Sequence, residues 1–567
     1  MTQIFIGQHP RRVPRLIRRW GLVMFRWVIL PWLQRHPNVQ AVLLDLEEAV
    51  ISKRCNYHRY KTIVDDDYSA VIAAADDLAW QTAGHWYGPM PAPAQYWGEI
   101  SKQSFYPSLK CLYEEAGIID AIIEREQPNV VWRWADIPRL TGNCRIRSLN
   151  PAWALLTVRW CVIIGTRLLS SIKDLTTLVA PSPTNFTPTS GYVAMIDTPN
   201  HYRTLSAVAQ AMPAIYFLPL NRSTQKLCQH DGANYVTPSA LVTLRDLLPY
   251  WRGLRVVWQG WDKHQADIPE TIVHELKVLA AFYWPRLILL RLTLSRLWAQ
   301  FHPRIALTAV GFWAPYRLFL DQADRYNAKR VVVAHGNIPR TPAFYGEANY
   351  DQILVRGAVE EDNLIRMGIP SSLITVVGQL TDARDVSKDR YLPVQPPRTI
   401  LVAMQGFGGE MSYCEYAKFI TELDGAITSD INRRWIIRLH YQQPQYWGLW
   451  RAMFGNRPNV ILVTDQPFET LLKNSKIEAL VTVFSSTALE AAAHNIPVVT
   501  VNFSGMEELL PFSATGLSHE VRMPHALTQV LARPLTPPSR DAYTKFIARS
   551  GQATVRSAID AINQTLP

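Results

Sequence analysis

The chain has 567 residues and a formal net charge of +11, from 58 Lys or Arg and 47 Asp or Glu. Its apolar fraction of 48% and charged fraction of 19% are those of a globular protein, which argues against disorder, collagen-like repetition and a polytopic membrane protein. The length predicts two or three packed units of roughly 150 to 200 residues. The basic excess favours an anionic partner: nucleic acid, a phosphorylated substrate or an acidic membrane surface.

The N-terminal region has no clean apolar core followed by a small-residue cleavage site, so no signal peptide is expected. The six cysteines are scattered, without a CxxC pair or a Cys/His cluster at zinc spacing, which fits a reducing cytoplasm.

Three apolar segments rich in arginine and tryptophan stand out, at residues 21–33, 151–172 and 283–300. The first is only about half the ~20 residues that a spanning helix needs, and Arg26 interrupts it. Such segments suit interfacial helices that lie among anionic headgroups. Helices that pack on a core, with arginine heads reaching water, explain each segment equally well. An anionic membrane surface therefore remains a candidate partner.

Residues 1–190 have a weak pattern. Strands are predicted at residues 40–44 and 130–134, but the aromatic and proline-rich region between them has no clear period. We expect residues 1–190 to be the N-terminal part of the first domain plus an accessory insertion. A separate accessory unit is the alternative.

From residue 191 onward, short β-branched runs alternate with helical segments, and this alternation predicts parallel sheets covered on both faces. The expected fold class is α/β, with two doubly wound Rossmann-like domains, residues 191–390 and 391–567, facing each other across a cleft. The first series has predicted strands at 192–196, 255–259, 305–310 and 330–334 and a helix at 315–326. The second, after the proline-rich residues 393–398, has predicted strands at 399–404, 435–439, 460–463, 479–483 and 498–501.

Hydroxyl side chains lie at a strand-to-helix junction in residues 480–499, where a strand runs into Ser485, Ser486 and Thr487. Free backbone N–H groups and the helix dipole at such a junction suit a phosphate. Glu490, on the first turn, is placed to accept hydroxyls of a ribose or sugar. The alternative is an ordinary helix cap that binds nothing.

Other candidate side chains follow strands. Arg438 and His440 fall on one face at the carboxyl end of a strand, where open α/β sheets bind ligands, and together could neutralise a diphosphate leaving group. His335 and Gly336 end another strand, and a glycine there permits close backbone approach to a ligand. Each of these residues could equally be structural.

The order of VVVAHG, MGIPSSLITVVGQLTD, LVAMQG, IIRLHYQQP, VTVFSSTALEAAAHNIPVV and SGQATVRSAIDAI resembles the GT-B glycosyltransferase fold. More narrowly, it resembles the bacterial surface-polysaccharide branch with CDP-glycerol glycerophosphotransferases, capsule Kdo transferases and polysialyltransferases. The resemblance covers about residues 300 to 565. It implies that the C-terminal domain holds a nucleotide-sugar donor.

Carried over residue by residue, the resemblance implies donor-phosphate binding by Ser485, Ser486 and Thr487. His440 matches the histidine of a His-Pro motif, although Tyr441 follows it here. The Gly-x-Pro-x-x-Asp element near the domain junction becomes residues 378–382, which keep the glycine and the aspartate but not the proline.

The resemblance further implies displacement at the anomeric carbon without a metal, and an inverting reaction then needs a base on the first domain. Three candidates lie at or near strand ends: Asp197, His201 and Asp136. Asp197 could instead cap the helix that follows it. No metal and no cofactor is expected besides the nucleotide-sugar co-substrate, CMP-linked or UDP-linked.

The expected function is therefore sugar transfer from a nucleotide-activated donor to a surface polysaccharide or lipid-linked glycan, by a cytoplasmic enzyme peripheral at the inner membrane. A nucleotide-sugar 2-epimerase and an inactive GT-B scaffold are the alternatives. Nucleic acid is not an expected partner, because the basic residues do not form long runs interleaved with aromatics.

Overall fold

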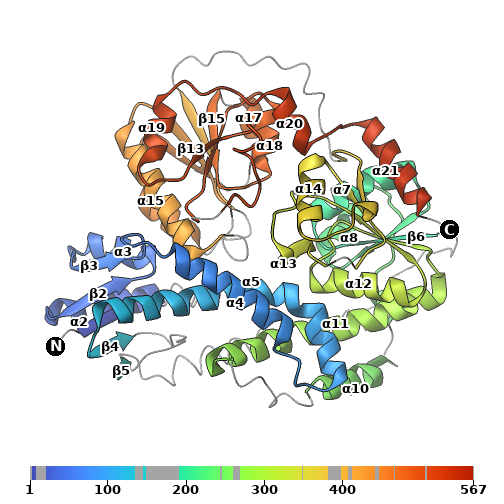
Figure 1. Cartoon of the computed structure of the whole chain (residues 1–567), viewed down its shortest axis with the longest axis horizontal. Helices are drawn as coiled ribbons and strands as arrows, with labels where there is room; N and C mark the ends of the chain where they lie inside the picture. Colours follow the sequence, from blue (N-terminus) through green and yellow to red (C-terminus); the bar gives the residue numbers. More distant parts are fainter. Residues whose placement is uncertain are drawn as a thin grey trace.

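The computed structural model describes most of the chain, and its strands form three parallel sheets of five, six and six strands (Figure 1). The described residues are 3–7, 21–133, 145–148, 191–242, 246–258, 268–347, 349–380, 398–405, 411–440, 446–464, 466–474, 476–504 and 507–565.

The N-terminal sheet has the strand order β3-β2-β1-β4-β5. It consists of β1 (Gln3–Gly7), β2 (Val39–Leu43), β3 (Tyr60–Thr62), β4 (Val130–Arg133) and β5 (Arg145–Ser148), with α2 (Leu30–Arg35) and α3 (Leu46–Arg54). The strands predicted at residues 40–44 and 130–134 are β2 and β4. They pair on either side of β1 in a sheet of their own, whereas we expected them to begin the first domain.

The second sheet has the order β11-β10-β9-β8-β6-β7 and belongs to the first Rossmann-like domain. Its strands are β6 (Tyr192–Ile196), β7 (Ile215–Pro219), β8 (Ile305–Thr308), β9 (Lys329–Val333), β10 (Gln352–Val355) and β11 (Ile374–Val376). Its helices are α7 (Pro199–Ala211), α8 (Arg222–His230), α9 (Pro238–Leu241), α12 (Ala314–Arg325), α13 (Pro342–Tyr345) and α14 (Ala358–Arg366).

The prediction of a strand at residues 255–259 is wrong, because most of this segment is the end of helix α10 (Leu247–Trp258). Its β-branched pair suggested a strand, but packing decides the conformation. Leu254 is buried, and Gly253 lies so close to α11 that an added Cβ would come within 2.9 Å of Ile288.

The third sheet has the order β14-β13-β12-β15-β16-β17 and confirms all five strands predicted after residue 398. Its strands are β12 (Thr399–Ala403), β13 (Arg434–Arg438), β14 (Val460–Val463), β15 (Ile477–Thr482), β16 (Val498–Val501) and β17 (His519–Val521). Its helices are α15 (Tyr413–Ser429), α16 (Trp447–Phe454), α17 (Phe468–Asn474), α18 (Thr487–Ala493) and α19 (Ala526–Ala532). The expected α/β class with two doubly wound domains is confirmed.

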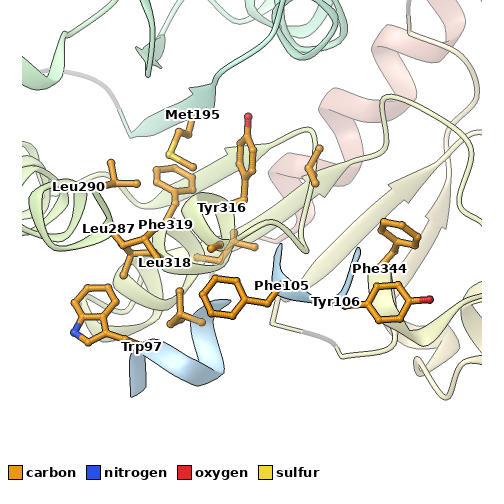
Figure 2. Packing of buried hydrophobic residues seen from close by; sticks show 14 of the residues in the cluster. Trp97, Phe105, Tyr106, Met195, Leu287, Leu290, Tyr316, Leu318, Phe319 and Phe344 are labelled. Atoms are coloured by element: carbon orange, nitrogen blue, oxygen red, sulfur yellow. The ribbon is translucent and has the colours of Figure 1, made fainter. Parts of the chain in front are cut away.

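Three long helices lie between strands of the first two sheets: α4 (Ser69–His85) and α5 (Ala92–Glu126) between β3 and β4, and α11 (Glu270–Phe301) between β7 and β8. The first half of α5 buries Trp97 and Phe105 with α11 and α12 in the core of the first domain (Figure 2). Its second half buries Ile118 and Ile122 in a core shared by the N-terminal sheet and the C-terminal domain. One helix thus belongs to two hydrophobic cores.

Helix α11 contains the apolar segment 283–300 and is long and apolar enough, between residues 275 and 301, to cross a membrane. Trp284, Leu294 and Trp298 are nonetheless almost completely buried in the core of the first domain. One face of this segment therefore packs on the core, as the alternative interpretation expected, and the interfacial interpretation stays a prediction. Residues 151–172 lie outside the described part of the chain.

The chain ends by returning to the first domain through α20 (Arg540–Phe546) and α21 (Gln552–Gln564), which buries Ile562 beside β6 and β8. Gln379 donates its backbone N–H to the Arg549 carbonyl at 2.9 Å. Gly378 has φ +103°, and a Cβ there would lie 2.4 Å from the Arg549 oxygen, so only glycine fits this position.

Candidate functional site

The carboxyl end of β6 carries a carboxylate held by two side chains. Asp197 follows β6 directly, and the Tyr316 hydroxyl on α12 donates to its Oδ1. His201 Nδ1, on α7, lies 2.7 Å from the same Oδ1 and 2.7 Å from the Tyr316 hydroxyl. The structure therefore brings together two of the three predicted base candidates. Asp136 lies outside the described residues.

Asp197 does not cap α7, because its neighbour does. The Thr198 side chain accepts the His201 N–H at 3.2 Å and is the N-cap of the helix. Asp197 itself keeps 31% of its side chain exposed, whereas His201 is only 6% exposed. The carboxylate is thus the member of this group that a bound molecule can reach.

The pKa values of Asp197 and Tyr316 are shifted in opposite directions. Burial alone would raise the pKa of Asp197, but the hydrogen bonds from His201 and Tyr316 outweigh it and lower the pKa below the usual value. Burial and the Asp197 charge raise the pKa of Tyr316 well above its ordinary value. At neutral pH an ionised carboxylate is therefore held by a neutral phenol.

His335 stands beside this group, with its ring perpendicular to that of His201 and the ring centroids 4.4 Å apart. Its Nδ1 is 3.0 Å from the Ala309 carbonyl, which can only accept, so Nδ1 carries the proton and Nε2 is an acceptor. Burial, His201 and Arg356 lower the pKa of His335 to about 3. The space where Gly336 would carry a Cβ is empty to 4 Å, so packing does not demand this glycine.

The carboxyl edge of the second domain carries Arg438 and His440, as predicted. Arg438 donates from Nε to the Gln466 carbonyl at 3.4 Å and stacks over the Phe468 ring, 5.7 Å from its centroid. Burial, followed by the Arg438 charge, lowers the pKa of His440. This histidine is therefore neutral at physiological pH and can donate or accept one hydrogen bond.

The strand-to-helix junction lies where it was predicted, and the backbone N–H groups of residues 487–490 have acceptors within the turn. Thr487 N–H donates to the Ser485 hydroxyl at 3.3 Å, and the next three N–H groups are accepted by carbonyls of the same turn. The turn tightens here, with i→i+3 bonds at residues 488 and 489. The side chains remain available: Ser486 is exposed, and the buried Thr487 hydroxyl has no hydrogen-bond partner among the described residues.

Glu490 faces this edge with an altered acidity. The crowding of surrounding protein raises its pKa, an effect that the Arg438 charge opposes and Glu469 increases. Its side chain still retains a large accessible surface, so it is crowded by protein yet open to solvent. The Arg438 charge thus lowers the pKa of His440 and opposes the rise in the pKa of Glu490, so the three side chains belong to one site.

The carboxyl edges of the two Rossmann-like sheets are turned toward each other. The loop after β9 donates the Arg340 N–H to the Leu509 carbonyl, in the loop after β16, at 2.9 Å. Arg340 also pairs with Glu507 at 3.7 Å. The pKa of Tyr543 on α20 is affected by two charges: Arg356 of the first domain lowers it and Glu490 of the second raises it, although burial is the largest cause of its net rise.

Two residues of this region were missed by sequence reasoning: Tyr316 and Tyr543. Arg356 is 5% exposed, pairs with Glu360 and reaches Gln379 at 3.3 Å, which anchors the loop ends of the first domain. Tyr316 lies in the first turn of a helix after a strand, a position that could have signalled it. Among the described residues, no group of three or more His, Cys, Asp or Glu is placed to hold a metal ion.

No protein-family model and no curated protein sequence matches the chain. Solved structures similar to 66% of it include the UDP-GlcNAc 2-epimerase from Methanocaldococcus jannaschii, at 11% identity over 99% of that chain with a TM-score of 0.44. A second is the UDP-GlcNAc 2-epimerase from Neisseria meningitidis bound to UDP-GlcNAc, at 11% identity over 100% of that chain with a TM-score of 0.44. A third is the lipopolysaccharide outer core galactosyltransferase WaaB, at 14% identity over 100% of that chain with a TM-score of 0.41. Both again cover 66% of this chain.

The two doubly wound sheets with facing carboxyl edges are the GT-B arrangement that the sequence resemblance implied. The narrower likeness to capsule transferases stays a prediction. Function therefore has to be inferred from this chain's own residues.

Proposed function

We propose that the chain is a metal-independent glycosyltransferase that moves a sugar from a nucleotide-activated donor to a surface polysaccharide or lipid-linked glycan. The observation that carries this proposal is Asp197. It is an ionised, partly exposed carboxylate, held by His201 and Tyr316 at a sheet edge whose loops contact the opposite, Arg438-bearing domain.

The donor phosphate would lie at the carboxyl edge of the third sheet, in the C-terminal domain. The hydroxyls of Ser485, Ser486 and Thr487 would hydrogen-bond its oxygens, and Arg438 would neutralise the charge of the leaving nucleotide. Neutral His440 would donate one further hydrogen bond. Glu490 would accept hydroxyls of the ribose or sugar.

In the proposed reaction, the acceptor hydroxyl lies between Asp197 and the anomeric carbon of the donor sugar. The acceptor oxygen forms the new C–O bond, the bond between the anomeric carbon and the phosphate of the leaving nucleotide breaks, and Asp197 takes the proton of the hydroxyl. His201 and Tyr316 are positioning residues that fix the carboxylate through Oδ1. A single displacement inverts the configuration, so inversion is part of the proposal. His335 and Gly336 would line the donor side of the first domain.

Nucleotide binding tests the donor site. Of CMP, CDP, UDP, GDP and their sugars, one nucleotide is expected to raise the melting temperature of the chain most and so to name the donor class. The double variant Ser486→Ala/Thr487→Ala should bind that nucleotide at least about 10-fold more weakly in calorimetry, because two hydroxyl contacts are lost. Ser429→Ala, an exposed hydroxyl at the end of α15 in the same domain, is the matched control.

Unchanged affinity in the double variant would remove these hydroxyls from the donor site. A 2-epimerase is separated by a second measurement, incubation of the bound nucleotide sugar without an acceptor. Inversion at C2 observed by NMR would contradict the transferase and support the epimerase. A chain that no nucleotide stabilises and that leaves every donor intact would be the inactive scaffold.

A further inference from the structure

Helix α10 presents one exposed stripe that mixes apolar and basic side chains. Leu248 is 58% exposed and Trp251 is 60% exposed, and Arg252 and Arg255 are exposed beside them. These four positions have the spacing i, i+3, i+4 and i+7, so they share one face of the helix. We call this face the α10 stripe.

The opposite side of α10 faces the protein. Leu254 is buried, and Gly253 lies against Ile288 of α11. Residues 247–258 contain no acidic side chain, and the nearby Asp246 is buried and paired with Arg296 at 2.6 Å. Among the described residues neither Arg252 nor Arg255 forms an ion pair, so the α10 stripe places two positive charges next to exposed indole and leucine.

A second surface of the same character lies in the helical segment before β2. Val23, Trp27 and Val28 are 45%, 67% and 44% exposed, and the exposed Arg26 lies over the Trp27 ring at 5.2 Å. Phe25, Ile29 and Leu33 of this segment are buried against the N-terminal sheet. We call Val23, Arg26, Trp27 and Val28 the N-terminal patch.

Figure 1 draws helix α10 at the lower right margin of the molecule and α2, which continues the patch segment, at the lower left. Strand β5 on that margin exposes Arg145 and Arg147. The crossing helix α20 lies at the opposite, upper side. The segments along this lower margin therefore all carry exposed arginine, and two of them also expose aromatic and aliphatic side chains.

We propose that this margin docks on an anionic lipid bilayer, with the α10 stripe as its principal contact. Tryptophan and leucine that keep more than half of their surface in water gain free energy when they enter the boundary between headgroups and acyl chains. The neighbouring arginines meet the negative surface potential of anionic lipids, which contributes about fivefold in affinity for each basic residue near the surface. A bilayer supplies the apolar and the anionic complement in one partner.

This proposal does not depend on the nature of the reaction. Docking would place an enzyme next to lipid-linked acceptors, but binding to vesicles is measured without any substrate. A failure of sugar transfer and a failure of docking are therefore separate results.

Co-sedimentation of the full chain with vesicles tests the proposal. Wild type is expected to bind vesicles of phosphatidylcholine and phosphatidylglycerol in equal parts, more weakly at high salt, and to bind phosphatidylcholine alone poorly. The variant Arg252→Gln/Arg255→Gln should lose about 30-fold in affinity for the anionic vesicles, fivefold for each charge. Leu248→Ser/Trp251→Ser should lose binding at every salt concentration.

The matched control replaces apolar residues elsewhere. Ile431 and Met523 in the C-terminal domain are 72% and 71% exposed, and Ile431→Ser/Met523→Ser should bind as wild type does. All these positions are exposed, so unchanged circular-dichroism melting checks that each variant is folded.

Two results would overturn docking through the α10 stripe: wild type that stays in the supernatant at low salt, or stripe variants that sediment like wild type. Equal binding to neutral vesicles would overturn the electrostatic part. A stripe that mediates self-association in light scattering, without vesicle binding, would identify it as a protein interface instead.

Discussion

Asp197 shows how one residue becomes a candidate base through its neighbours. The sequence placed it at a strand end and His201 four residues later, and both positions are confirmed. Tyr316 could not be paired with them from sequence, because it is 119 residues away and reaches Asp197 only when β6 and β8 lie side by side. Asp197 and Tyr316 carry the first prediction.

Replacement of Asp197 by Asn should lower kcat by about 100-fold or more with a small change in KM, because the proton acceptor is lost and the shape is kept. Tyr316→Phe removes one donor to Asp197, so the pKa of the carboxylate should rise toward its ordinary value. The acid limb of the kcat/KM profile, where Asp197 protonates, should therefore move to higher pH.

The pH dependence of kcat/KM, measured for wild type and both variants, checks these expectations. Tyr326→Phe, at a tyrosine that is 41% exposed at the end of α12, should leave the profile unchanged and serves as the control. An identical acid limb in Tyr316→Phe and wild type would show that Asp197 is not the titrating base.

Elements were predictable where the pattern was strong and local. Every strand predicted after residue 398 is present, because runs of β-branched and other apolar residues bounded by turns favour strands. The strand predicted at residues 255–259 is wrong because the packing of Gly253 against Ile288 favours a helix there. The crossing of residues 548 and 549 to the first domain could not be predicted, because its partners, Arg356 and Gln379, lie 192 and 170 residues away in sequence.

The crossing gives a prediction at this scale. Gly378→Ala forces a side chain into a positive φ and against the Arg549 carbonyl, and it should lower the free energy of unfolding by about 3 kcal/mol. Gly368→Ala has a similar positive φ, +90°, but open space around its Cβ, and should cost only about 1 kcal/mol. Chemical denaturation of both variants separates backbone strain from the contact, and equal losses would contradict the contact.

The molecule as a whole is larger than its two expected domains. A third parallel sheet precedes them, and the last helix of the chain completes the first domain instead of the second. Sequence periodicity reports which face of a helix is apolar, but it does not say which domain will cover that face. The described residues of 1–190 were for this reason the least predictable.

Loss of the α21 contact should therefore destabilise a domain that begins more than 300 residues earlier. Ile562 is fully buried against β6 and β8, and Ile562→Ala should cost about 2–5 kcal/mol. Faster hydrogen exchange is expected in the amides of β6 (Tyr192–Ile196) and β8 (Ile305–Thr308). Ile559→Ala, at a partly buried position on the same helix, should cost only about 1 kcal/mol. Faster exchange confined to the C-terminal domain would contradict this docking.

Helix α5 constrains how the two Rossmann-like domains can move. Its first half is fixed in the core of one domain and its second half in the core that includes the other. A swing of one domain against the other must therefore bend or shift this helix. Pro107, near its middle, lacks the N–H that would bond to the preceding turn and is the natural point of bending. Opening and closing of the candidate site would then require elastic bending of a single helix, and the bent helix would tend to return the domains to their resting arrangement.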